Sequence, residues 1–171
     1  MPDAFFDVHW GGDGSPAPLS WIGEERIAIG GRPAARTVAL LPALGVTHVV
    51  NCRARAQVTW SRDLAAERAV FGATRVAHAP MWDFGRPQQP RLWAHAARFA
   101  ARTLDEDPKA RVLVHCHRGR HRSAMLAYAV LRLRGRTATE ATALVLTHRP
   151  GAELMTAYVR SVEQWLAALP V

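Results

Sequence analysis

Residues 112–123 read Val112-Leu113-Val114-His115-Cys116-His117-Arg118-Gly119-Arg120-His121-Arg122-Ser123. The apolar run predicts a strand, the polar residues after it predict a short loop, and a helix is predicted from Arg122 onward. A junction of this kind presents unpaired backbone N–H groups and the positive end of a helix dipole. Gly119 allows the loop to adopt positive φ and to turn its amides inward. The segment therefore predicts a binding site for an anion.

Cys116 opens this loop and Arg122 closes it. The loop amides, the helix dipole and the nearby cations favour a Cys116 thiolate, which is then placed to attack phosphorus. The planar fork of Arg122 matches two phosphate oxygens, which a lysine does not. Ser123 is expected to donate to the sulfur, while His115 either orients the loop or is a satisfied histidine at a strand end. The alternative for Cys116 is an inert buried cysteine, but the full context favours a nucleophile.

The flanking sequence alternates β-branched runs with longer helical patterns. Strands are predicted at residues 26–29, 46–51, 74–79 and 111–115, and helices at residues 33–44, 61–71, 91–104, 122–134, 137–148 and 153–169. Ser61 is the predicted N-cap of the second helix, Thr137 with Glu140 predicts a capping box, and residues 80–90 are predicted to be a loop. This alternation predicts an α/β fold with a central, mostly parallel sheet. The β-branched runs count against a helical bundle.

The segment HCHRGRHRS, residues 115–123, matches the His-Cys-x5-Arg-Ser/Thr signature, and the chain resembles the small (atypical) dual-specificity branch of the protein tyrosine phosphatase superfamily. The resemblance extends to IAIGGRPAA, to LGVTHVVNC and to the long segment from Ala124 to Pro150. It covers about residues 20–169. It implies a sheet of about five strands flanked by helices, of the cysteine-phosphatase type. It also implies hydrolysis of phosphate monoesters through a phosphocysteine intermediate, without metal or cofactor.

The resemblance also implies a general acid about thirty residues before the cysteine. Asp83 lies 33 residues before Cys116, in a segment that resembles the Asp-Phe-Gly-x-x-Pro-like acid loop of the family. Asp83 would protonate the leaving oxygen and later deprotonate the attacking water. The alternative is an ordinary solvated loop residue, and Asp63 is a weaker candidate because it lies in a predicted helix. Gln164 is the first glutamine after the Arg-Pro turn, too far into the last helix to match the water-placing glutamine of some relatives.

The variable residues of the loop are unusually basic, and we expect the whole set to bind substrate. The set consists of His115, His117, Arg118, Gly119, Arg120 and His121. Many protein phosphatases of this branch carry small, uncharged residues there. Basic residues at the positions of His117 and Arg120 resemble the phosphoinositide-phosphatase branch, and a polyanionic substrate would need several cations. The alternative is that Arg118 and Arg120 face solvent. A dual-specificity or tyrosine protein phosphatase is the first expectation, and a phosphoinositide or inositol-polyphosphate phosphatase is the alternative.

Composition sets further bounds. The chain has 171 residues and a net charge of +8, which fits an irregular leader at residues 1–18 followed by one catalytic domain at residues 19–171. The sequence has no run of five basic residues, so a nucleic-acid-binding tail is not expected. No segment predicts a membrane span or a secretory signal. Two cysteines are too few for a disulfide framework, which favours the cytoplasm. We expect a monomer acting on a phosphorylated protein or a polyanionic small molecule or lipid. A phosphate-binding module without catalysis is a further alternative.

Cys52 ends the predicted strand at residues 46–51. The carboxyl ends of parallel strands gather at one sheet edge, so Cys52 is expected near Cys116. Lipid-phosphatase relatives carry a second cysteine at the matching place, where it forms a disulfide with the nucleophile under oxidation. Cys52 is therefore either a redox partner of Cys116 or a small core cysteine.

Overall fold

The computed structural model describes residues 19–171, apart from the side chains of residues 35–37, so the predicted leader at residues 1–18 lies outside the described residues. The strands are β1 (Leu19–Trp21), β2 (Ile27–Gly30), β3 (His48–Arg53), β4 (Val76–Met81) and β5 (Val112–His115). They form one sheet in the order β1-β2-β5-β3-β4. Only the β1–β2 pair is antiparallel within the described part of the chain. The predicted mostly parallel sheet is thus confirmed.

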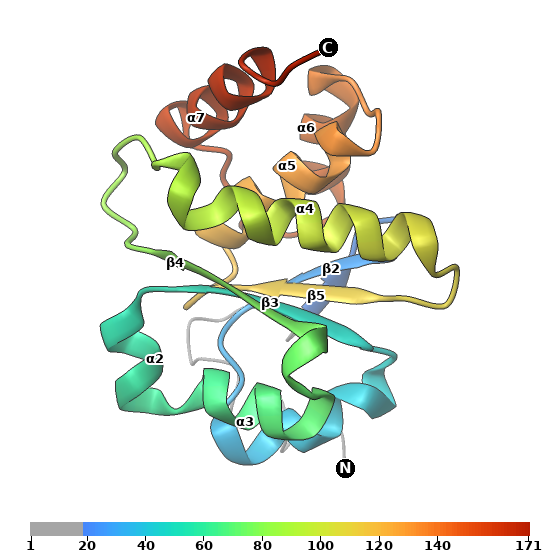
Figure 1. Cartoon of the computed structure of the whole chain (residues 1–171), viewed down its shortest axis with the longest axis vertical. Coiled ribbons are helices and arrows are strands. Elements are labelled where there is room, and N and C mark those ends of the chain that lie inside the picture. Colours follow the sequence, from blue (N-terminus) through green and yellow to red (C-terminus); the bar gives the residue numbers. More distant parts are fainter. Residues whose placement is uncertain (1–18) are drawn as a thin grey trace.

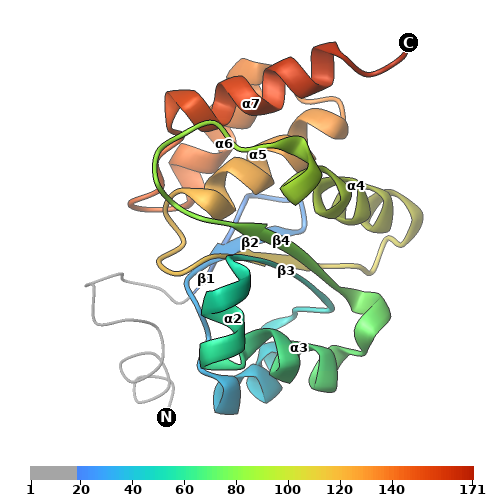
Figure 2. The ribbon, with the colours of Figure 1, turned by 60° about the vertical axis from the view of Figure 1, so that its left-hand side comes forward.

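Helices cover both faces of this sheet (Figures 1 and 2). One face carries α4 (Pro90–Glu106), α5 (Arg122–Leu133), α6 (Ala138–His148) and α7 (Thr156–Ala167). The other face carries the 3-10 helix η1 (Ala35–Leu44), α2 (Arg55–Ser61), α3 (Asp63–Phe71) and the short η2 (Ala73–Arg75). Within residues 19–171 no helix combines the length and apolar character that crossing a membrane requires.

The core lies in two layers, one on each side of the sheet. Along β5, Val112 and Val114 belong to the larger layer under α4 and α5, whereas Leu113 belongs to the smaller layer under η1 and α3. Alternate residues of a strand face opposite sides of a sheet, so a strand buried on both faces is apolar throughout. Because β5 is central and its residues are all buried, its carboxyl end is a rigid base for the loop that follows.

Several predicted boundaries were wrong for local reasons. The predicted helix at residues 33–44 begins at Ala35 and is a 3-10 helix, with Pro42 inside it; proline lacks the N–H that an α-helix would use at that position. Ser61 does not cap a helix but ends α2, a helix that was not predicted, and its hydroxyl donates to the carbonyl of Gln57. The cap of α3 is Arg62, which has a φ of 60°.

Two strand ends also differ from prediction, and one strand was not predicted. β3 continues two residues beyond Asn51, so Cys52 lies within the strand. β4 runs through Pro80 to Met81, which shortens the predicted loop at its start. β1 was missed because three residues at a sheet edge carry too little periodicity to predict a strand. By contrast, the capping box at Thr137 and Glu140 is present as predicted.

Candidate active site

The predicted anion site is a hollow of about 250 Å³ at the carboxyl edge of the sheet. It lies where β5 ends and α5 begins. Its lining residues are Gln57, Asp83, Cys116, His117, Arg118, Arg120, His121 and Arg122. Asp83 comes from the segment between β4 and α4, and Gln57 comes from α2. Three segments far apart in the sequence therefore contribute to one cavity.

Cys116 lies at the base of this cavity, with 2% of its surface exposed. Its sulfur lies 3.2 Å from the hydroxyl of Ser123. Burial raises the pKa of the Cys116 thiol, but the Arg122 guanidinium, the Ser123 hydroxyl and the backbone amides of Ser123 and Arg120 outweigh burial and lower this pKa to about 7. Thiol and thiolate forms of Cys116 therefore coexist at neutral pH, and the thiolate fraction rises with pH.

We expect Ser123→Ala to raise the pKa of Cys116 by about one unit, because the thiolate loses a hydrogen bond of the charge-assisted kind. The pH dependence of alkylation by iodoacetamide measures this pKa, since only the thiolate reacts. Cys52→Ala serves as the control, because burial raises the pKa of the Cys52 thiol well above its usual value. An unchanged midpoint in Ser123→Ala would show that the hydroxyl does not stabilise the thiolate.

Arg122 is the first residue of α5 and is 3% exposed. One of its terminal nitrogens, Nη1, donates to the side-chain oxygen of Gln57 at 2.8 Å and to the carbonyl of Met81 at 2.7 Å. Its Nε is buried and has no hydrogen-bond partner among the described residues. An unpaired buried donor is costly. The guanidinium is thus held in place by Nη1, while Nε makes no hydrogen bond with the described residues.

Arg149, at the end of α6, holds the nucleophile loop through hydrogen bonds to its backbone carbonyls. Its Nε donates to the carbonyl of Gly119 at 3.2 Å, its Nη2 to that of Arg118 at 3.4 Å, and its Nη1 to the hydroxyl of Ser20 at 3.2 Å. Gly119 has a φ of +67°, and a Cβ there would lie 2.6 Å from the backbone of Gly30. Only glycine fits this close approach. Gly119 therefore shapes the loop and does not line the cavity.

Asp83 lies at the cavity wall between two hydrogen-bond donors. Its Oδ1 accepts from the hydroxyl of Tyr158 at 2.7 Å, and its Oδ2 lies 2.8 Å from Nδ1 of His121. Burial raises the pKa of Asp83, but the contacts with Tyr158 and His121 and the charge of Arg122 outweigh it, so this pKa is lowered. The carboxylate is thus oriented toward the cavity but ionised in the free protein at neutral pH.

The basic loop residues have different surroundings. Arg120 is bonded to Glu153 at 3.1 Å and to the carbonyl of Gly151 at 3.2 Å. His117 and Arg118 are exposed at the cavity rim. Burial and the charges of nearby arginines lower the pKa of His117. Arg118 is therefore a cation available to a ligand at the rim, whereas much of the charge of Arg120 is already offset by Glu153.

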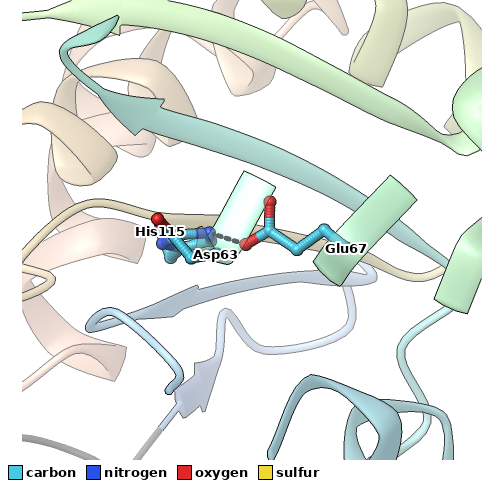
Figure 3. Close-up of side chains that lie close together, drawn as sticks. All are labelled: Asp63, Glu67 and His115. Atoms are coloured by element: carbon cyan, nitrogen blue, oxygen red, sulfur yellow. Dashed lines mark hydrogen bonds and ion pairs between the residues drawn. The ribbon is translucent and has the colours of Figure 1, made fainter. Parts of the chain in front are cut away.

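A buried polar cluster lies beneath the loop and includes Asp63, Glu67 and His115 (Figure 3). Nε2 of His115 bonds to Glu67, and Arg53 donates to Asp63 at 2.8 Å. Asn51 donates to the remaining oxygens of both carboxylates at 3.0 and 3.1 Å. Every carboxylate oxygen is therefore already paired, and the cluster is an internal ion-pair network.

The ion-pair network holds the His115 and Asp63 side chains beneath the loop. Burial lowers the pKa of His115, but the Glu67 and Asp63 carboxylates outweigh burial and raise it. The other ring nitrogen of His115 lies 3.3 Å from the carbonyl of Cys116, so the ring supports the loop and does not line the cavity. Asp63 likewise lies in the network, away from the cavity wall.

Cys52 lies in β3 in the same core layer as Cys116, and both thiols are free. Burial, followed by the nearby negative charge of Cys116, raises the pKa of Cys52. The two cysteines thus lie near each other at the carboxyl edge of the sheet. A redox role for Cys52 stays a prediction.

Five residues of the site were not predicted: Gln57, Glu67, Arg149, Glu153 and Tyr158. Each comes from an element distant in sequence from the loop, and a single sequence does not show such pairings. The Arg149-Pro150 dipeptide was the one available signal, through the resemblance. Gln164, exposed on α7, does not line the cavity.

Solved structures with this fold are numerous. Tk-PTP in its active form is 23% identical to this chain, with a TM-score of 0.72 over 90% of this chain and 99% of that one. Human DUSP28 is 23% identical, with a TM-score of 0.67 over 90% and 95% of the two chains. PTPMT1 in complex with PI(5)P is 14% identical, with a TM-score of 0.72 over 87% and 94%. No protein-family model and no curated protein matches the chain. The predicted fold of the cysteine-phosphatase type is confirmed by these structural neighbours.

Proposed function

We propose that this chain, which has the fold of the small dual-specificity phosphatases, is a phosphoric monoester hydrolase that uses Cys116 as its nucleophile. The observation that carries the proposal is the pairing of Cys116 and Arg122 in one cavity. The Cys116 thiol has a pKa lowered to about 7, and the buried Nε of Arg122 has no hydrogen-bond partner within residues 19–171. A phosphate group supplies both an electrophile for the thiolate and oxygens for the guanidinium.

The reaction proceeds in two displacements at phosphorus. In the first, the Cys116 thiolate forms a P–S bond while the P–O ester bond breaks, and Asp83 gives a proton to the departing oxygen. In the second, Asp83 takes a proton from water, which forms a new P–O bond as the P–S bond breaks. Ser123 donates to the sulfur and stabilises the departing thiolate. Arg122 and the loop amides hold the equatorial oxygens throughout.

The test is hydrolysis of 4-nitrophenyl phosphate in the presence of a chelator. Turnover and a phosphocysteine trapped by rapid acid quench support the proposal. Binding of inorganic phosphate without turnover would instead indicate a phosphate-binding module. Absence of both would overturn the proposal.

The expected substrates are phosphorylated proteins, hydrolysed by a monomer at phosphotyrosine or at phosphoserine and phosphothreonine. The free thiols of Cys52 and Cys116 suit a reducing compartment such as the cytoplasm. A panel of phosphotyrosine and phosphothreonine peptides at equal concentration ranks these substrates by kcat/KM.

A second candidate is a phosphoinositide or inositol-polyphosphate substrate. The exposed cation Arg118 at the cavity rim favours it, because extra phosphates on the ligand would meet positive charge there. The ion pair of Arg120 with Glu153 counts against a contribution from Arg120.

We expect Arg118→Ala to lower kcat/KM for an inositol polyphosphate about tenfold more than for a monophosphorylated ester, since only the former presents a second anion to the rim. Arg120→Ala is the matched control, and we expect it to affect both substrates alike. Equal effects of Arg118→Ala on both substrates would remove this candidate.

A further inference from the structure

His121 makes contacts on both of its ring nitrogens. Nδ1 lies 2.8 Å from Oδ2 of Asp83, and Nε2 lies 3.2 Å from Oε2 of Glu153. Carboxylates accept hydrogen bonds and do not donate them when ionised. Both contacts are hydrogen bonds at once only when both ring nitrogens carry a proton, so the geometry fits a cationic imidazolium between two carboxylates.

A difficulty in the proposed chemistry concerns the charge of Asp83. A general acid must carry a proton when the substrate binds. Yet the bonds from Tyr158 and His121 lower the pKa of Asp83, so this carboxyl is mostly ionised in the free protein at neutral pH. The proton that the leaving group needs is therefore absent from Asp83, whose Oδ2 lies 2.8 Å from Nδ1 of His121.

We propose that His121 is the proton reservoir of the general acid: it passes its Nδ1 proton to Asp83 as Asp83 protonates the leaving oxygen. This proposal rests on the proposed function. His121 acts through Asp83 and is thus a positioning residue and a proton relay. The sequence shows only a basic loop, whereas the structure gives this histidine a specific partner.

The protons balance over the two steps. When the P–O bond breaks, the His121 Nδ1 proton moves to Asp83 and the Asp83 carboxyl passes one proton to the leaving oxygen, which leaves an ionised Asp83 and a neutral imidazole with Nε2–H toward Glu153. When water attacks the phosphocysteine, its proton goes to Asp83 and from there back to Nδ1. The cycle thus restores the imidazolium and consumes no external acid or base.

The charges around the ring favour this arrangement. Glu153 faces Nε2 from the segment between α6 and α7 and stabilises the cationic ring, although its side chain is 58% exposed and the stabilisation is screened. Tyr158 of α7 donates to the other oxygen of Asp83. The cations Arg120, bonded to the same Glu153, and Arg122 line the cavity with His121. A substrate dianion beside Arg122 offsets that charge and favours the proton on Asp83.

The decisive variant is His121→Asn, measured as the pH profile of kcat/KM. An asparagine amide can still donate to Asp83 but holds no transferable proton, and asparagine suits the N-cap position that His121 occupies in α5. We expect the ratio of kcat/KM for phosphotyrosine to kcat/KM for an aryl phosphate with an activated leaving group to fall about tenfold near pH 7.5. We also expect the alkaline limb of the phosphotyrosine profile to move about one pH unit lower.

Glu153→Gln is the second variant, because it keeps the Asp83–His121 contact and removes the outer carboxylate. We expect the same shift of the alkaline limb in the same direction, but smaller. A His121→Asn profile that superimposes on the wild-type profile, with an unchanged substrate ratio, would show that the substrate dianion alone protonates Asp83 and would overturn the relay. The wild-type protein tests the proposed function in the same assay, since failure to turn over the activated ester contradicts that function and not the relay alone.

Discussion

Replacing Cys116 by serine is expected to lower kcat for 4-nitrophenyl phosphate by at least about 10⁴-fold while phosphate binding is retained. A serine hydroxyl has a far higher pKa than the thiol, and the surroundings that lower the pKa of Cys116 to about 7 still leave serine protonated. The loop amides and the Arg122 guanidinium remain in Cys116→Ser, so we expect the anion site to be intact. Steady-state kinetics measure the loss, and titration calorimetry with inorganic phosphate measures the binding.

Cys52→Ala is the matched control for Cys116→Ser, because it removes the other thiol from the same core layer. It is expected to retain turnover if it folds, which thermal unfolding checks. Residual turnover by Cys116→Ser above about one part in a thousand would contradict a cysteine nucleophile. Loss of phosphate binding in the same variant would contradict the separation of nucleophile and cradle.

The second large effect is expected from Asp83→Asn. For phosphotyrosine, whose leaving group is basic, kcat/KM should fall by about 10²–10³-fold, the usual range for loss of a general acid. For an aryl ester with an activated leaving group the loss should be below about tenfold. The asparagine keeps an oxygen for the Tyr158 hydroxyl, so the loss reports the proton and not the position of the loop. Kinetics on the two esters under identical conditions give the comparison.

The pH dependence supplies a further check on Asp83. The contacts with Tyr158 and His121 lower the pKa of Asp83, so its acid form depends on a proton delivered in the complex with substrate. That proton becomes scarcer as the pH rises, and wild-type activity on phosphotyrosine should fall on the alkaline side. Asp83→Asn should lose that limb. Asp105→Asn is the control, since Asp105 is an exposed acid on α4 that pairs with Arg134 away from the cavity. Equal losses on both esters would remove Asp83 from the acid role.

The nucleophile loop could be predicted because its chemistry is local. Cys116, Gly119 and Arg122 lie within seven consecutive residues, and the strand before them is apolar on both faces. A strand, a tight turn and a helix N-terminus are all set by neighbouring residues. The parallel sheet followed from the alternation of strands and helices for the same reason.

The rest could not be predicted because it depends on contacts between distant segments. Gln57 reaches Arg122 across 65 residues, and His121 reaches Asp83 across 38. Helix α2, which carries Gln57, begins at Arg55, and its N-cap Ala54 has no side chain that could accept a hydrogen bond, so the usual N-cap signal is missing from the sequence. Only the folded structure shows that Arg120 is paired with Glu153, whereas Arg118 is exposed at the cavity rim.

Arg149 has a consequence for how the protein is made. Its guanidinium joins the nucleophile loop to Ser20, which lies 129 residues earlier in the chain. Cys116 also precedes Arg149 by 33 residues, so the nucleophile loop is synthesised before the residue that holds it. Contacts of such long sequence separation form late in folding. We therefore expect the loop to reach its final conformation only after the sheet edge and the end of α6 have met.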